Sequence, residues 1–182
     1  MNHVPTEVLE SGLEAIQQSP KATGVLRLIV RRPDIGLRET IHEGRLDEVA
    51  GLLGDSWPQR GSAKTADGSA HPDVQITIMN SRVIALIAGS PERWPLAGDQ
   101  LFADLDISAN NLPAGARLSV GEAIIEITEP PHLGCAKFKE RFGAAALAWA
   151  NSPTGRELRL RGAHARVVTG GVIRVGDPIV KL

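Results

Sequence analysis

Cys135 is the only cysteine in the chain, and the residues around it are those expected near a reactive thiol. An apolar run at residues 123–128 predicts a β-strand that stops before Pro130 and Pro131, because proline cannot continue a hydrogen-bonded ladder. Apolar residues three or four apart over residues 138–150 then predict a helix. Cys135 is therefore expected on a loop near a helix start, where unpaired backbone N–H groups and cations lower the pKa of a thiol.

Three cations follow the cysteine closely, namely Lys137, Lys139 and Arg141. They would favour the thiolate, which is the form that attacks electrophiles and binds metals. A lone cysteine is also often a small buried hydrophobic residue, so that alternative stays open at this stage. His132 is the one candidate base for the thiol, although two side chains three residues apart need not meet.

Two further groups of arginines could bind an anion. Arg31, Arg32 and Arg38 flank a predicted loop, where they form either an anion site or a solvated surface. The second group either points outward from a hairpin or converges on one anionic ligand. This group consists of Arg156, Arg159, Arg161, Arg166 and Arg174.

Other common types of site have no pattern in this sequence. The single cysteine and five histidines never form the close pairs of a zinc site. A phosphate loop ending in Gly-Lys-Ser/Thr, a dinucleotide-binding glycine pattern and a serine nucleophile elbow are also missing. Asp99, Asp104 and Asp106 lack the spacing of a calcium loop and are expected to face water.

Length and charge limit the class of protein. A chain of 182 residues is the size of one domain and would bury roughly 70% of the surface that its unfolded form exposes. Twenty basic and 21 acidic residues leave a net charge of −1, which gives no signal for nucleic acid or an anionic membrane. One cysteine excludes an internal disulfide and fits a reducing compartment. The N-terminus lacks the layout of a signal peptide and no apolar run approaches the ~18 residues of a membrane span, so we expect a cytoplasmic protein.

The pattern of short alternating runs, with 19 glycines and 12 prolines, predicts a mostly β protein. Helices are predicted at residues 6–19, 82–88 and 138–150, the second with an N-cap at Asn80 and an end at Gly89. A diglycine at residues 170–171 predicts a tight hairpin, and residues 179–182 predict an edge strand. Residues 39–55 are ambiguous, and residues 56–72 predict a long loop that is either a binding element or mobile. The predicted strands are residues 25–32, 74–80, 102–107, 118–121, 123–128, 158–168, 172–175 and 179–182.

The order of several segments resembles a stand-alone MOSC domain, the molybdenum cofactor sulfurase C-terminal domain. The match covers roughly residues 24–182, and its strongest parts are Cys135 after the long strand and the predicted carboxy-terminal hairpin. Many relatives carry a histidine where this chain has Ser56-Trp57, and Gly-Glu-Asn-Leu appears here as Gly98-Asp99-Gln100-Leu101. The matching segments are residues 51–55, 75–80, 96–101, 118–128, Cys135 and residues 161–177.

The resemblance implies a fold and an activity. It implies a MOSC-like β-barrel with a short N-terminal helix and a helix after the cysteine loop, as one domain over residues 1–182. Residues 1–23 would be a helical extension and residues 24–182 the barrel. It implies that Cys135 is a sulfur carrier or a molybdenum ligand, and the protein would then bind molybdenum cofactor (molybdopterin), a small-molecule ligand.

Some relatives are thought to reduce N-hydroxylated compounds, so the resemblance allows a molybdenum-dependent reductase. The alternative is a carrier or adaptor domain that delivers sulfur or cofactor to a partner enzyme. Either function implies a partner protein, which would be a sulfurase or a redox protein. No pyridoxal phosphate is expected, because the chain has no aminotransferase-like domain. The residues expected to bind the cofactor are Arg31, Arg32, Asp99, Gln100, Lys137, Arg141 and Arg161.

Overall fold

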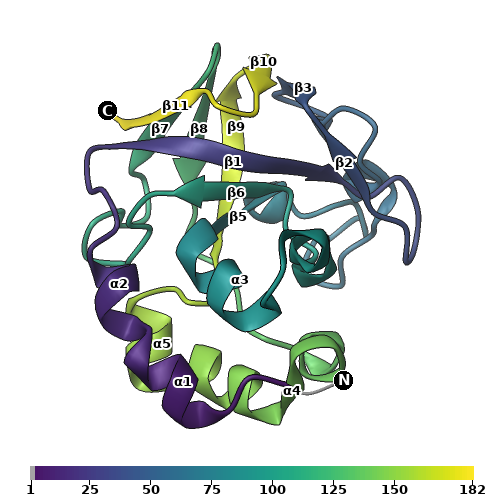
Figure 1. Cartoon of the computed structure of the whole chain (residues 1–182). Coiled ribbons are helices and arrows are strands. Elements are labelled where there is room, and N and C mark those ends of the chain that lie inside the picture. The colour runs from purple at the N-terminus through teal and green to yellow at the C-terminus, as the bar shows by residue number, and fades with distance from the viewer. Residues whose placement is uncertain (1–2) are drawn as a thin grey trace.

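The computed structural model describes residues 3–182, and its centre is a closed β-barrel (Figure 1). The barrel strands are β1 (Thr23–Arg31), β5 (Ile76–Asn80), β6 (Leu101–Asp104), β7 (Arg117–Val120), β8 (Ala123–Ile127), β9 (Ala163–Thr169) and β11 (Pro178–Lys181). They lie in the order β11-β7-β8-β9-β5-β6-β1, and pairing of β1 with β11 closes the ring. All neighbours are antiparallel except β5 and β6, which are parallel. The predicted MOSC-like barrel is confirmed.

A small second sheet and one added strand extend the barrel. Strand β2 (Glu39–Ile41) pairs with the end of β1. Strands β10 (Gly171–Arg174), β3 (Glu43–Asp47) and β4 (Gly51–Leu52) form a separate three-stranded sheet. The ambiguous region at residues 39–55 is therefore made of strands and turns.

Five helices lie beside the barrel in the part of the chain that the structure describes (Figure 1). They are α1 (Thr6–Ser11), α2 (Leu13–Gln17), α3 (Ser81–Ala88), α4 (Ala136–Asn151) and α5 (Pro153–Glu157). Alternate residues along a strand pack into two different hydrophobic cores, because successive side chains point to opposite faces of the strand. Leu101 and Ala103 of β6 belong to the core inside the barrel, whereas Phe102 belongs to the core between barrel and helices.

Several local predictions are confirmed. Strands β7 and β8 form the predicted hairpin, with Val120 opposite Ala123. The Asn80 side chain accepts hydrogen bonds from the N–H groups of Arg82 and Val83, and Gly89 ends α3 with a φ of 75°. Residues 56–72 form the predicted long loop, with a short 3-10 turn at Trp57–Gln59.

Several predictions are corrected by the structure. The strand predicted at residues 158–168 begins only at Ala163, because residues 158–162 form a turn after α5. The N-terminal helix is interrupted at Gly12 into α1 and α2, and α4 contains a non-helical residue at Gly143, with a φ of 95°. The diglycine does not form a hairpin, because β9 pairs with β8 and β5 whereas β10 pairs with β3. A Cβ at Gly171 would lie 2.6 Å from the carbonyl carbon of Glu122, so the glycine lets the chain cross closely from one sheet to the other. Strand β11 is no edge strand, since it pairs with both β7 and β1.

Connections on the barrel bring distant segments together. Arg32 directly follows β1, Asp55 follows β4, and Asp99 precedes β6. Arg161 lies between α5 and β9, and residues 128–135 connect β8 to α4. No helix in the described part of the chain is long and apolar enough to span a membrane.

Candidate functional site

Cys135 is exposed and precedes the first turn of α4, which confirms the predicted strand-to-helix loop and contradicts the buried alternative. Its backbone is extended, with a φ of −122°. Partial burial raises the pKa of the thiol, but the N–H groups of Phe138 and Lys137 and the guanidinium groups of Arg161 and Arg141 outweigh it. The pKa of Cys135 therefore lies below its usual value, which favours the thiolate.

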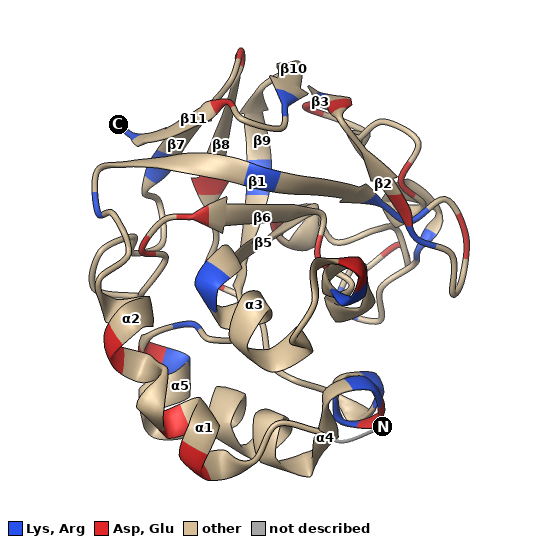
Figure 2. Ribbon diagram, in the orientation of Figure 1, with Lys and Arg blue, Asp and Glu red and all other residues tan. Residues whose placement is uncertain are grey.

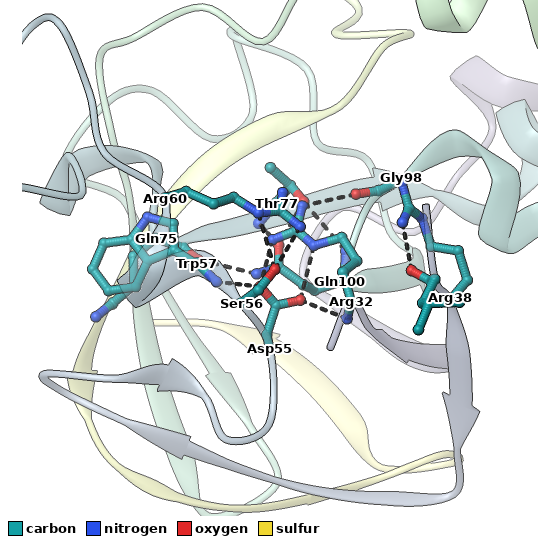
Figure 3. Close-up of polar contacts among 11 residues, drawn as sticks. Arg32, Arg38, Asp55, Ser56, Trp57, Arg60, Gln75, Thr77, Gly98 and Gln100 are labelled. Carbon is teal, nitrogen blue, oxygen red and sulfur yellow. Dashed lines mark hydrogen bonds and ion pairs between the residues drawn. The ribbon is translucent and has the colours of Figure 1, made fainter. Parts of the chain in front are cut away.

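A buried ion pair between Arg32 and Asp55 joins three loops near this end of α4. The guanidinium Nε donates to Asp55 Oδ2 at 2.8 Å, and Nη2 donates to Oδ1 at 2.9 Å. Arg32 Nη1 also donates to the carbonyl oxygen of Gly98 at 2.9 Å, and Asp55 Oδ1 accepts from the Trp57 N–H at 2.9 Å. Figure 3 shows Arg32 among these partners. The side chain of Asp55 is 0% exposed, so its charge depends on Arg32.

Asp99 does not face water, as its acidic surroundings in the sequence suggested, but is 0% exposed and forms a second buried ion pair at the start of α4. Arg161 Nη1 donates to Asp99 Oδ2 at 2.7 Å, and Nη2 donates to the carbonyl oxygen of Ala97 at 2.9 Å. Burial raises the pKa of Asp99, and the Arg161 guanidinium opposes that rise. The same guanidinium lies 5.0 Å from the ring centroid of Phe138, a cation–π distance, in the first turn of α4. Asp99 is therefore linked through Arg161 to the helix turn that holds Cys135.

Positive charge exceeds negative charge around these two pairs. Arg38 has its pKa lowered by burial and by the neighbouring guanidinium groups of Arg141, Arg32 and Arg60. Arg141 Nη1 donates to the carbonyl oxygen of Leu96 at 2.6 Å, which holds it over the same loop. Figure 3 shows Arg38 and Arg60 on either side of Arg32, and Figure 2 shows further basic residues at the beginning of α4. We call the following set the arginine cluster: Arg32, Arg38, Arg60, Arg141 and Arg161.

Five guanidinium groups thus meet two carboxylates, those of Asp55 and Asp99. The Nε atoms of Arg38 and Arg161 are buried and have no hydrogen-bond partner among the described residues. Guanidinium groups with free donors match the oxygens of a phosphate. The arginine cluster is therefore suited to an anion.

A cavity of about 270 Å³ opens beside the cluster. We call it the basic cavity. Arg32 and Arg60 contribute charge to it, and His132 and His164 form part of its wall. The remaining lining residues are Trp57, Gly61, Ser62, His71, Val74 and Thr77.

His132 and His164 form a tilted ring pair, with centroids 4.5 Å apart and an angle of 37° between the ring planes. His132 Nδ1 lies 3.4 Å from Asp99 Oδ1, so His132 faces Asp99 and not Cys135. Gly162 makes this approach possible: its φ is 108°, and a Cβ there would lie 3.1 Å from His132 Nδ1. Burial lowers the pKa of both imidazoles, and Arg161 lowers both further, so both rings are neutral near pH 7.

The sequence profile described as "MOSC domain" matches residues 67–180, which is more than half of the chain. The chain belongs to the MOSC domain family. No curated protein sequence matches it significantly.

Solved structures share the MOSC barrel. The YuaD protein from Bacillus subtilis is 18% identical, with a TM-score of 0.64, over 86% of this chain and 94% of that protein. YiiM from Escherichia coli is 21% identical, with a TM-score of 0.55, over 87% of this chain and 69% of the other. YiiM from Geobacillus stearothermophilus is 16% identical, with a TM-score of 0.52, over 87% and 73%. With sequence identities of 16–21%, these similarities show that the fold is shared and nothing more.

The residues that the MOSC resemblance assigned to the cofactor fall into two sets. Arg32, Asp99, Arg141 and Arg161 come together in or beside the arginine cluster. The other three lie elsewhere or have other contacts. Arg31 pairs with Glu39, Lys137 is exposed at the start of α4, and the Gln100 amide is hydrogen-bonded to Thr77 and Gln75.

Sequence reasoning missed other residues that the MOSC fold brings to this place. Arg60, His71 and Trp57 line the basic cavity but lie in the long loop that carried no periodic pattern. His164 joins them from β9. The family resemblance had pointed to the Gly54-Asp55 step, and a search for charged residues next to that step would have found Arg60.

The two neighbouring arginines, Arg31 and Arg32, give a matched test of the buried pair. We expect Arg32→Met to lower the free energy of unfolding by about 3–5 kcal/mol, because it leaves the Asp55 carboxylate buried without its partner. Arg31→Met should change it by less than about 1 kcal/mol, because the Arg31–Glu39 pair is exposed. Urea denaturation of the two variants measures the difference, and equal effects would contradict this description of Arg32.

Arg141→Gln should raise the pKa of the Cys135 thiol, because it removes a cation that stabilises the thiolate. The rate of alkylation by iodoacetamide, followed against pH, should shift to higher pH and be slower near neutrality. Arg156→Gln is the control, since Arg156 is exposed on α5 and its Nε is bonded to the Asn151 carbonyl oxygen. An unchanged profile in Arg141→Gln would remove Arg141 from the surroundings of the thiol.

Proposed function

We propose that this MOSC protein binds molybdenum cofactor, with Cys135 as the molybdenum ligand and the arginine cluster as the binding site for the pterin phosphate. One observation carries the proposal: an exposed thiol of lowered pKa lies near Arg161 and Arg141, two members of a cluster of five guanidinium groups that is balanced by only two carboxylates. A thiolate is a soft donor that suits molybdenum, and arginines suit a phosphate.

The residues present fit such a group. The unpartnered Nε atoms of Arg38 and Arg161 are donors that a phosphate could use. Arg32 and Arg161 are held by buried carboxylates, so their guanidinium groups do not have to be ordered when an anion binds. Arg60 and Arg141 are less buried and would complete the neutralisation of the anion.

The chemistry that fits this arrangement is the reduction of N-hydroxylated compounds. When bound, the cofactor supplies a redox-active molybdenum that accepts two electrons from an external donor and passes them to the substrate. Two electrons and two protons convert an N–OH group to an N–H group and water. The chain's own residues hold the thiolate, neutralise the phosphate and place two neutral imidazoles in the cavity wall. A redox protein is the donor that this function requires, and a reducing compartment such as the cytoplasm would keep the thiol free.

The exposure of Cys135 also supports a second function, that of a carrier. A thiolate at the protein surface can accept sulfane sulfur from a sulfurase as a persulfide, or hand cofactor to a partner enzyme. This function needs no substrate in the cavity.

Cys135→Ser should abolish most of the bound molybdenum, because a serine hydroxyl is neither soft nor ionised at neutral pH. The measurement is metal analysis with pterin fluorescence on protein produced in a host that makes the cofactor. Since Cys135 is exposed, the variant should keep the fold, which far-ultraviolet circular dichroism checks. Full retention of molybdenum in the variant would remove the assigned role of the cysteine.

The enzyme and carrier functions predict different results for the loaded wild-type protein. The enzyme should convert an N-hydroxylated compound when a reduced viologen dye supplies electrons, over many turnovers. A carrier should show no turnover and should lose its cofactor or sulfur to an acceptor protein. Substrate turnover by wild type that disappears in Cys135→Ser favours the enzyme.

A further inference from the structure

A second cavity, of about 180 Å³, shares the His132–His164 pair with the basic cavity. We call it the second cavity. It lies along the loop between β8 and Cys135 and against the segment that leads from α5 into β9. Its other lining residues are Thr128, Glu129, Pro130, Pro131, Leu133, Gly155, Arg156, Arg159, Gly162 and Ala163.

The second cavity differs in chemistry from the basic cavity. Its walls include two proline rings and the apolar side chains of Leu133 and Ala163. The guanidinium of Arg159 is engaged elsewhere, because Nη1 donates to the carbonyl oxygens of Leu112 at 2.6 Å and Ile107 at 3.3 Å. Glu129 and Arg156 are exposed charges of opposite sign, and Arg159 adds a positive charge that its two carbonyl partners do not neutralise.

The neighbours of the two Nδ1 atoms decide whether each imidazole presents a hydrogen-bond donor or an acceptor to a ligand. His164 Nδ1 lies 3.0 Å from the carbonyl oxygen of Pro130, and because a carbonyl only accepts, Nδ1 carries the hydrogen. His132 Nδ1 makes no hydrogen bond, but Asp99 Oδ1 lies 3.4 Å away, and a carboxylate oxygen at that distance favours the tautomer with the hydrogen on Nδ1. In both neutral rings Nε2 is then the hydrogen-bond acceptor that faces a ligand.

The two Nε2 acceptors and the arginines near them determine which charge a ligand of the second cavity can carry. Two acceptors favour a molecule that donates an N–H or O–H, and their lone pairs repel the acceptor oxygens of an anion placed against them. A cation is disfavoured by Arg161 and Arg32, the same charges that lower the pKa of His132. The rings of His132, His164, Pro130 and Pro131 line the cavity, and ring faces favour contact with a flat molecule.

The rim of the second cavity has a strained backbone. Arg159 has a φ of 50° and is the one non-glycine residue of the described chain with a positive φ. Its carbonyl oxygen accepts from the Gly162 N–H at 2.7 Å, which fixes the turn that enters β9. Strain of this kind persists where the surrounding structure holds it, often beside a ligand site.

We infer that the second cavity binds the reactant, a small, flat, uncharged molecule with an N–H or O–H donor, and that His132 and His164 receive that donor. The role as reactant rests on the proposed function, whereas the binding itself does not. The phosphate would lie at the arginine cluster, two members of which line the basic cavity, and the reactant would lie on the other side of the two imidazoles.

Benzamide and benzoate test this inference as a matched pair, since they share a flat shape and differ in charge and in N–H donors. Each is titrated into the protein without cofactor, and the Cε1–H resonances of His132 and His164 are followed by NMR. Benzamide should shift both resonances in a saturable way and bind at least ten times more tightly than benzoate. No saturable shift with benzamide, or equal binding of benzoate, would overturn the inference.

Leu133→Trp should weaken benzamide binding at least tenfold, because the larger side chain fills the second cavity from its partly exposed side. Val49→Trp is the control for adding an indole, since Val49 is 84% exposed and lines neither cavity. Unweakened binding in Leu133→Trp, or equal weakening in both variants, would refute the assignment to this cavity. Because no molybdenum is present, loss of the proposed function in the Cys135→Ser experiment and failure of benzamide to bind are separate results.

Discussion

The loops beside the start of α4 are arranged around two fully buried carboxylates, those of Asp55 and Asp99. A buried charge is tolerated only when a partner and hydrogen bonds compensate it. Arg32 compensates Asp55 from the end of β1, and Arg161 compensates Asp99 from the entrance to β9. Each pair spans two chain segments that secondary structure alone would not hold together. The loops of the site are therefore fixed by charge compensation in addition to apolar packing.

The barrel supplies the rigid frame for these pairs. Its interior is filled by aliphatic side chains, and the helices cover one outer side through a second core that includes Phe138. Phe138 packs in that core and also receives the guanidinium of Arg161. Apolar packing of α4 and the polar site thus meet at one residue, three positions after the cysteine. The helix turn can favour the thiolate because apolar packing holds α4 in place and Asp99 holds Arg161 in place.

The sequence predicted the features that depend on neighbours along the chain. The loop around Cys135, the cap at Asn80 and the hairpin of β7 and β8 follow from proline placement, capping chemistry and alternation. Features that depend on closure of the barrel could not be predicted in this way. Arg161 and Asp99 are 62 residues apart, and no local pattern records that they meet.

The errors have the same physical origin. Residues 170–171 have the composition of a hairpin turn, but tertiary pairing of β10 with β3 takes precedence over local preference. Arg31 and Arg32 are equivalent in composition, yet one pairs at the surface and the other in the interior, because adjacent residues at a strand end point to opposite sides. The family resemblance gave the order of the segments along the chain. Which candidate residues lie at the surface and which in the interior could be read only from the structure.

The pairing of β1 with β11 has a consequence for how the protein is made. Thr23 lies opposite Val180, so the first barrel strand cannot pair with its last neighbour until residues 178–181 have left the ribosome. Contacts of such long sequence separation form late and slowly, because a large loop must close before they contribute to stability. Arg32 and Asp55 can meet early, whereas Arg161 reaches Asp99 only with the carboxy-terminal third. During synthesis the Asp99 carboxylate therefore exists without Arg161 until a late stage of folding, whereas Cys135 has Arg141 and the N–H groups of its own helix turn as soon as α4 forms.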